Sequence, residues 1–179
     1  HCISSAASDV YKRQHMGQLF IEGDDKLTYK LQDIFPTDLK NLLVNQSKYS
    51  FLMNENAGIH DDLIITKNSS GYMIILNAAC KEKDFEIIKS KLGEDFKISL
   101  SKDLSLIAVQ GPESKNIIEK IIPGVNELKF MFGGDYKYNL NNIYITRSGY
   151  TGEDGFEISI NNNDVVKFVE TLILSLIHI

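Results

Sequence analysis

Residues 62–77, with the sequence DLIITKNSSGYMIILN, constrain the fold more than any other part of the chain. Two runs of aliphatic and β-branched residues flank the turn-forming residues NSSG, which is the pattern of a β-hairpin. If the turn is centred between Ser69 and Ser70, Asp62 lies directly opposite Asn77 at the open end of the hairpin. Opposed side chains on one face lie roughly 4.5–5.5 Å apart at Cβ. We therefore expect a carboxylate and an amide to share one place at a sheet edge.

This pair fits either a ligand site or a solvated strand end. Asp and Asn are common at strand ends because their side chains bond to nearby backbone groups. The preceding loop, NENAGIHDD at residues 54–62, contains Gly58, whose missing side chain would let a ligand approach closely. Both interpretations are open on these residues alone.

Short strands and helices alternate along the rest of the chain. Asp24 can cap a helix that Phe35-Pro36 would end, and Thr37 can cap a short second helix through Val44. Further strands are expected at residues 17–23, 48–54, 96–100, 104–111, 142–148 and 155–160, and further helices at 82–92, after Pro112 and after Asp164. This mixed order, with at least two hairpins, predicts an α+β fold with mixed or antiparallel sheets and helices packed on them.

Composition excludes several classes of protein. The net charge is −5 and no basic stripe is visible, which argues against a nucleic-acid partner. Cys2 and Cys80 are the only cysteines, with no CxxC or His/Cys cluster, so we expect no structural metal and a reducing compartment such as the bacterial cytoplasm. No apolar run is long enough for a membrane span.

The two ends of the chain lack this patterning. Residues 1–14, HCISSAASDVYKRQ, have neither a start Met nor the apolar region of a secretory signal. They resemble translated sequencing-adapter read-through, as do residues 174–179, LSLIHI. We expect both ends to be non-native, which leaves residues 15–173 as the natural region. A short transit peptide is the competing interpretation of the first segment.

A glycine-rich segment, RSGYTGEDGFEISI at residues 147–160, leads into a strand. Strand alternation places the apolar residues of 156–160 on the core face, so Glu157 points the other way, to water or to a cavity. A carboxylate can accept two parallel N–H donors, and Tyr150 adds an aromatic face with a polar tip. Ligand contact and solvent exposure are both open for these two residues. The acidic pair at 153–154 is expected to be a solvated turn.

This segment resembles a motif of the glycine cleavage system T-protein family, the folate-dependent aminomethyltransferases. Other stretches agree in order and spacing, namely HMGQ, YSFLMNENAGIHDDLII, ILNAACKEKD and LIAVQGPES. The resemblance covers His15 to Ile173, which is only part of a family member. Two positions depart from the family pattern: Ala57 stands where Gly is usual, and His60, expected to be exposed, stands where an aliphatic residue is usual.

The resemblance implies a set of site residues. Asp62 would be the catalytic carboxylate near N10 of the folate. Asn77 would contact the pterin, Glu157 would bind the pterin amino group and ring N–H, and Tyr150 would be a nearby aromatic. Tyr49 would be a tyrosine of the folate pocket.

The resemblance also implies a multi-domain folate-binding fold and a transferase reaction. The methylene group of an aminomethyl-dihydrolipoyl H protein would pass to the co-substrate tetrahydrofolate with release of ammonia, and no metal is needed. The lipoylated H protein would be the partner. Because only part of the family chain is present, we expect this piece to be inactive alone.

Three alternatives are weighed against the T protein. One is the folate-binding module of a sarcosine or dimethylglycine dehydrogenase. A flavin-binding motif upstream would identify such a protein. Another is a non-enzymatic folate-binding iron–sulfur-assembly protein, whose Lys-Gly-Cys-Tyr signature would lie downstream. The third is an interaction domain without a ligand. The length of the GYTGEDGFE match favours the T protein.

Overall fold

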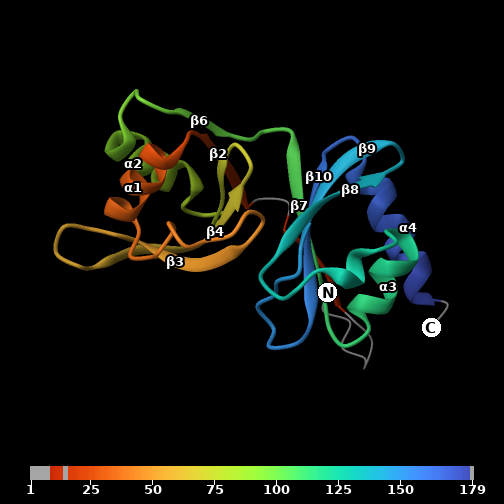
Figure 1. The fold of residues 1–179 in the computed structure, drawn as a ribbon. Coiled ribbons are helices and arrows are strands. Elements are labelled where there is room, and N and C mark those ends of the chain that lie inside the picture. The colour runs from red at the N-terminus through yellow and green to blue at the C-terminus, as the bar shows by residue number, and fades with distance from the viewer. Residues whose placement is uncertain (1–8, 14–15, 178–179) are drawn as a thin grey trace. The chain divides into compact units, whose positions relative to one another are not determined.

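The computed structural model describes residues 9–13 and 16–177, with the side chains of residues 16–175. The chain divides into two compact units. One comprises residues 15–102 and is called the hairpin unit; the other comprises residues 103–179 with the N-terminal 14 residues and is called the loop unit. Figure 1 shows the elements of each unit. No linker-like composition marks the boundary between Lys102 and Asp103.

The hairpin unit is a five-stranded sheet with two helices. The strand order is β3-β4-β5-β2-β6, and every neighbouring pair is antiparallel. Buried residues of both helices join those of the strands in one core that includes Leu27, Ile74 and Ile88. Its elements are β2 (Gly17–Glu22), α1 (Asp25–Ile34), β3 (Ser47–Met53), β4 (Ile59–Asn68), β5 (Gly71–Leu76), α2 (Lys81–Leu92) and β6 (Lys97–Leu100).

The β4–β5 hairpin has the predicted register. Leu63 pairs with Leu76 and Asn68 with Gly71, so paired residue numbers sum to 139. Asp62 and Asn77 therefore lie one step beyond the last pair, at the open end. Gly71 is required at the turn because a Cβ there would lie 2.1 Å from Ile21 O.

The first and last strands of the hairpin unit are neighbours. Leu19 of β2 pairs with Leu100 of β6, and Ser101 N–H donates to Gln18 O at 2.9 Å. The chain thus enters and leaves this unit at the same end of two neighbouring antiparallel strands.

The α1 helix begins as predicted, but the second helix through Val44 does not form. Asp24 caps α1 by accepting from Lys26 N–H at 3.0 Å. After Pro36 the chain makes turns instead, because the Gln32 side chain accepts from the N–H groups of residues 39 and 40. These bonds replace the helical partners that so short a segment would need, since helix nucleation is unfavourable.

A β-bulge interrupts β3 and β4 before the hairpin. Leu52 pairs with Asp61 and Met53 with Ile59, which leaves His60 without a partner in the ladder. His60 is exposed, as expected. In the preceding loop Ala57 has φ +60°, a left-handed conformation that favours glycine.

The loop unit is also a five-stranded antiparallel sheet, ordered β1-β7-β10-β9-β8. Its core combines both helices with the strands and includes Ile118, Phe156 and Phe168. Its elements are β1 (Asp9–Arg13), β7 (Leu104–Gln110), α3 (Ser114–Ile121), η1 (Val125–Glu127), β8 (Gly133–Tyr138), β9 (Asn141–Thr146), β10 (Gly155–Asn161) and α4 (Val165–Ile177). The structure thus has the predicted α+β class, with antiparallel sheets.

Two strands of the loop unit were not expected. The β1 strand lies in the segment interpreted as non-native and pairs with β7 through its backbone. The β8 strand has the sequence GGDYKY and is an edge strand with alternating burial, where glycine and charge are tolerated. At the other end, α4 extends to Ile177, past the expected boundary at Ile173. Among the residues that the structure describes, no helix is long and apolar enough to cross a membrane.

Candidate folate site

Tyr49, Asp62 and Asn77 form one hydrogen-bonded cluster in the hairpin unit. Tyr49 Oη donates to Asp62 Oδ2 at 2.9 Å. Asn77 Nδ2 lies 3.0 Å from both Asp62 Oδ1 and Asp62 O. The carboxylate of Asp62 is thus held from two sides by neutral donors, which fixes its orientation at the open end of the hairpin.

Strand geometry explains why these side chains meet. Leu63 and Ile65 of β4 belong to the core with the helices, so Asp62 points to the opposite face of the sheet. Tyr49 on β3 pairs with Ile64, which makes it a diagonal neighbour of Asp62. Tyr49 is 54% exposed, and the hydrogen bond to Asp62 raises the pKa of its hydroxyl.

A second acidic group lies beside this cluster and was missed from the sequence. Asp61 Oδ1 accepts from Asn77 Nδ2 at 2.9 Å and from Asp62 N–H at 3.0 Å. Asp84 of α2 is only 1% exposed, and neither of its carboxyl oxygens has a hydrogen-bond partner among the described residues. Burial, and to a lesser extent the charge of Asp61, raises the pKa of Asp84 to about 6. The available signal was the helical spacing from Asp84 to Ile88 and Leu92, which places a charged residue on a core-facing helix surface.

Glu157 lies in β10 with its apolar neighbours facing the core, as alternation predicted. Phe156 and Ile158 are fully buried in the loop-unit core. Glu157 is itself buried, and its Oε2 accepts from Ser148 Oγ at 2.7 Å. Ser148 is in turn bonded to Thr146 Oγ1 at 3.0 Å. Two buried hydroxyl groups therefore fix the orientation of the Glu157 carboxylate, which is not free to rotate in solvent.

The glycines of the 147–155 loop have two different functions. Gly149 and Gly155 pack on the buried side chain of Gln110, where an added Cβ would lie 2.0 and 2.3 Å from its Oε1. Gly152 has φ +81° and provides the left-handed turn. Tyr150 lies in this loop and is 48% exposed.

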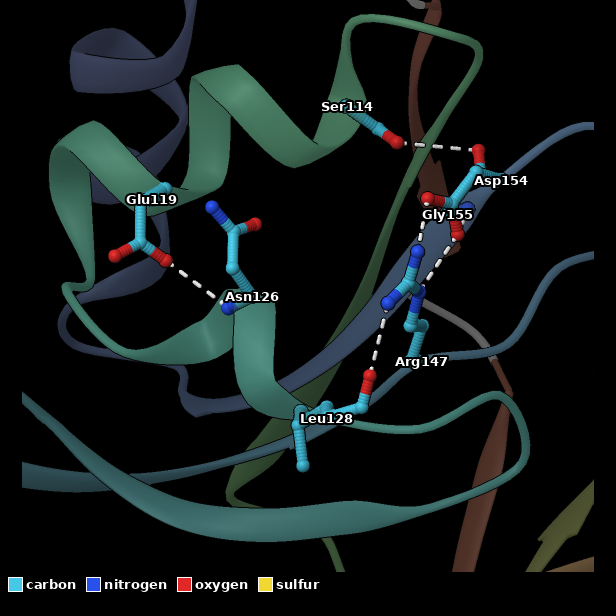
Figure 2. A network of polar contacts seen from close by, with 7 residues as sticks. All are labelled: Ser114, Glu119, Asn126, Leu128, Arg147, Asp154 and Gly155. Atoms are coloured by element: carbon cyan, nitrogen blue, oxygen red, sulfur yellow. Dashed lines mark hydrogen bonds and ion pairs between the residues drawn. The ribbon is translucent and has the colours of Figure 1, made fainter.

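Asp154 is not the solvated turn residue that the sequence suggested. Arg147 donates to both of its carboxylate oxygens, through Nε at 2.9 Å and Nη2 at 2.6 Å (Figure 2). Arg147 Nη1 also donates to Leu128 O, and Ser114 Oγ donates to Asp154 O. The last two bonds join the loop to α3 and to the segment before β8. Glu153 is exposed, as expected.

These features agree with one protein family. Residues 5–175 match the family model of the GCVT N-terminal domain. The chain belongs to this family. The resemblance to the T protein, an aminomethyltransferase family, is thereby confirmed.

Named relatives of this GCVT domain support the same assignment. The mitochondrial aminomethyltransferase of Dictyostelium discoideum is 36% identical over 173 residues, covering 91% of this chain and 43% of the relative. The crystal structure of glycine cleavage system aminomethyltransferase T from Bartonella henselae matches with a TM-score of 0.84 and 35% identity, covering 93% of this chain and 45% of that one. The chain spans less than half the length of these two proteins.

A sarcosine oxidase shares the fold alone. Heterotetrameric sarcosine oxidase from Corynebacterium sp. U-96 matches with a TM-score of 0.70 at 13% identity, covering 98% of this chain and 86% of that chain. At this identity the similarity shows that the two proteins share a fold, and it says nothing about the chemistry of this chain.

The five residues expected in the site fall into two groups. Tyr49, Asp62 and Asn77 lie together in the hairpin unit, whereas Tyr150 and Glu157 belong to the loop unit. Within the described part of the chain, no group of three or more His, Cys, Asp or Glu side chains could hold a metal ion.

Proposed function

We propose that this chain is the folate-binding part of an aminomethyltransferase of the glycine cleavage system. The methylene group of an aminomethyl-dihydrolipoyl H protein would pass to tetrahydrofolate, and ammonia would leave. The observation that supports this most is the Asp62 carboxylate held between Tyr49 and Asn77, in a chain of the GCVT family.

Asp62 is assigned the catalytic role. The reaction develops positive charge on the carbon being transferred, and a fixed carboxylate stabilises such charge without reorganising during the step. Tyr49 and Asn77 provide the fixation, because their donors leave the Asp62 side chain little freedom to rotate. The remaining contribution is positioning of the nucleophilic nitrogen, which supplies much of the rate in such transfers.

Glu157 and Tyr150 are assigned to folate binding. The Glu157 carboxylate accepts from Ser148 through Oε2, and its geometry suits the adjacent amino and ring N–H groups of a pterin. Tyr150 would lie against the bound ligand through its aromatic face. The lipoylated H protein is the proposed partner, and the bacterial cytoplasm is the proposed compartment because two cysteines and no CxxC motif fit reducing conditions.

The overall proposal is tested with the protein from the complete reading frame. Mixed with aminomethylated H protein and tetrahydrofolate, it is expected to release ammonia in amounts equal to the methylene transferred. Omission of tetrahydrofolate is the control and should abolish most of the release. A complete protein that binds tetrahydrofolate yet releases no ammonia from the H protein would contradict the assigned reaction.

Replacing Glu157 with alanine is expected to weaken folate binding without unfolding the loop unit. Loss of a charge-assisted hydrogen bond costs roughly 1.5–3 kcal/mol, which is about a ten- to hundredfold rise in Kd. Calorimetric titration of tetrahydrofolate into the complete protein measures it. Glu153→Ala is the matched control, because Glu153 is an exposed acid in the loop before the same strand. Equal tetrahydrofolate affinities for the two variants would contradict a role of Glu157 in folate binding.

A further inference from the structure

The amide group of Gln110 lies across the neck of the loop that carries Tyr150. Gln110 is the last residue of β7 and pairs with Gly155, the first residue of β10. An added Cβ would lie 2.3 Å from Gln110 Oε1 at Gly155 and 2.0 Å from it at Gly149. The two glycines stand on either side of the loop, so the glutamine amide occupies the space that their side chains would need.

One hydrogen bond fixes the orientation of this amide. Gln110 is 2% exposed, and its Nε2 donates to Ser148 O at 3.2 Å. A rotated amide would place two oxygens at this distance with no hydrogen between them. Oε1 is then buried without a hydrogen-bond partner among the described residues, which costs free energy. Stability alone would therefore favour an apolar side chain of the same length, so the glutamine at this position points to a second role.

Ser148 connects Gln110 to Glu157. Its carbonyl oxygen accepts from Gln110, and its hydroxyl donates to Glu157 Oε2 at 2.7 Å. Gln110 pairs with Gly155 in the β7–β10 ladder, two positions before Glu157 on the same strand. Alternation therefore places the side chains of Gln110 and Glu157 on the same face of the sheet. Because Ser148 bonds to both, the place where Gln110 holds its backbone sets the direction of the Glu157 carboxylate.

A different contact closes the loop at its ends. Arg147 donates to both carboxylate oxygens of Asp154, and these two residues flank the loop (Figure 2). This ion pair does not involve the side chain of Ser148 or that of Glu157. Removal of the Gln110 amide should therefore leave the loop closed while it frees the Ser148 backbone.

We propose that Gln110 is a positioning residue of the folate site, which holds the Ser148 backbone so that the Ser148 hydroxyl orients Glu157. The bonds that carry this role are Gln110 Nε2 to Ser148 O and Ser148 Oγ to Glu157 Oε2. The proposal rests on the proposed function in naming folate as the ligand of Glu157.

The first part of the test needs no ligand. In the complete protein, NMR relaxation measures the order parameters of the backbone amides of Ser148 and Gly149. We expect about 0.85 in the wild type and a fall toward about 0.6 in Gln110→Met, which keeps the side-chain length and removes both polar amide atoms. Ser105→Ala is the control, because it removes another side-chain hydrogen bond of β7, from Ser105 Oγ to Asn162 Oδ1, and should keep the wild-type values. An unchanged order parameter at Ser148 in Gln110→Met would overturn the proposal.

The second part measures ligand affinity and turnover in the complete protein. Gln110→Met should bind tetrahydrofolate roughly three- to tenfold more weakly, as expected for the loss of one hydrogen bond. Its kcat at saturating tetrahydrofolate should not change, because binding rather than the chemical step is affected. Ser105→Ala should match the wild type in both quantities. A lower kcat with an unchanged Kd in Gln110→Met would overturn the positioning role.

A double-mutant cycle separates this role from a general loss of stability. Ser148→Ala removes the hydroxyl that connects Gln110 to Glu157. If Gln110 acts through that hydroxyl, adding Gln110→Met to Ser148→Ala should weaken tetrahydrofolate binding little further. Losses that add in full would overturn the coupling. If the order parameter of Ser148 falls in Gln110→Met but even the wild type binds no tetrahydrofolate, the proposed function is wrong and the coupling of Gln110 to Ser148 stands.

Discussion

Replacing Asp62 with alanine is expected to lower the kcat of the complete enzyme by on the order of 100-fold or more. Removing one preorganised charge-stabilising group from an active site typically costs this much. Asp62 is oriented by two neighbours, Tyr49 at 2.9 Å and Asn77 at 3.0 Å. Because both of these side chains are neutral, neither can replace the charge of Asp62. Ammonia release under saturating H protein and tetrahydrofolate measures the effect.

Two further variants separate charge from structure at this position. Asp62→Asn keeps the size of the side chain and removes the charge, so its kcat should fall nearly as far as that of the alanine variant. Asp33→Asn changes an exposed acid of α1 and should leave kcat unchanged. An Asp62→Asn enzyme with normal kcat would contradict an electrostatic role for this residue.

Phe156→Ala is expected to reduce the free energy of unfolding of the loop unit by about 3–5 kcal/mol. The Phe156 side chain is fully buried in the loop-unit core, and the Arg147 guanidinium carbon lies 5.9 Å from its ring centroid. Its removal leaves a cavity at the strand that carries Glu157. Denaturant unfolding followed by far-ultraviolet circular dichroism measures the loss.

Phe130 provides a control of the same residue type in the same unit. It is 68% exposed, so Phe130→Ala should change the free energy of unfolding by no more than about 0.5 kcal/mol. Comparable losses in the free energy of unfolding for the two variants would mean that burial of the phenylalanine does not determine the destabilisation. Because Phe156 and Glu157 point to opposite sides of one strand, the pair of variants at 156 and 157 separates stability from ligand affinity.

The hairpin register could be predicted because it depends on local signals alone. The NSSG turn fixes which residues pair, and alternation then fixes which side of the strand each residue occupies. Asp62 and Asn77 at the open end, and Phe156 and Glu157 on opposite sides of β10, follow from these two rules and agree with the structure. The assignment of Asp62, Asn77 and Glu157 to folate stays a prediction.

The residues that were missed depend on contacts between distant elements. Asp84 is buried because α2 packs on the sheet, and no local pattern predicts which strand residues a helix will cover. Asp154 was expected in solvent because its partner, Arg147, is seven positions earlier across a loop whose path was unknown. The prediction of a helix after Thr37 was wrong for a related reason, because a glutamine of the preceding helix accepts hydrogen bonds from the N–H groups of this segment.

The adjacent placement of β2 and β6 has a consequence for synthesis on the ribosome. Residues 15–102 close upon themselves through the Leu19–Leu100 pairing, so every partner in their sheet has been made once Leu100 leaves the exit tunnel. The carboxylate–amide cluster can then be assembled while β7 to β10 are still being translated. Because its two ends lie on neighbouring strands, this segment is also suited to exchange as one piece between members of the family.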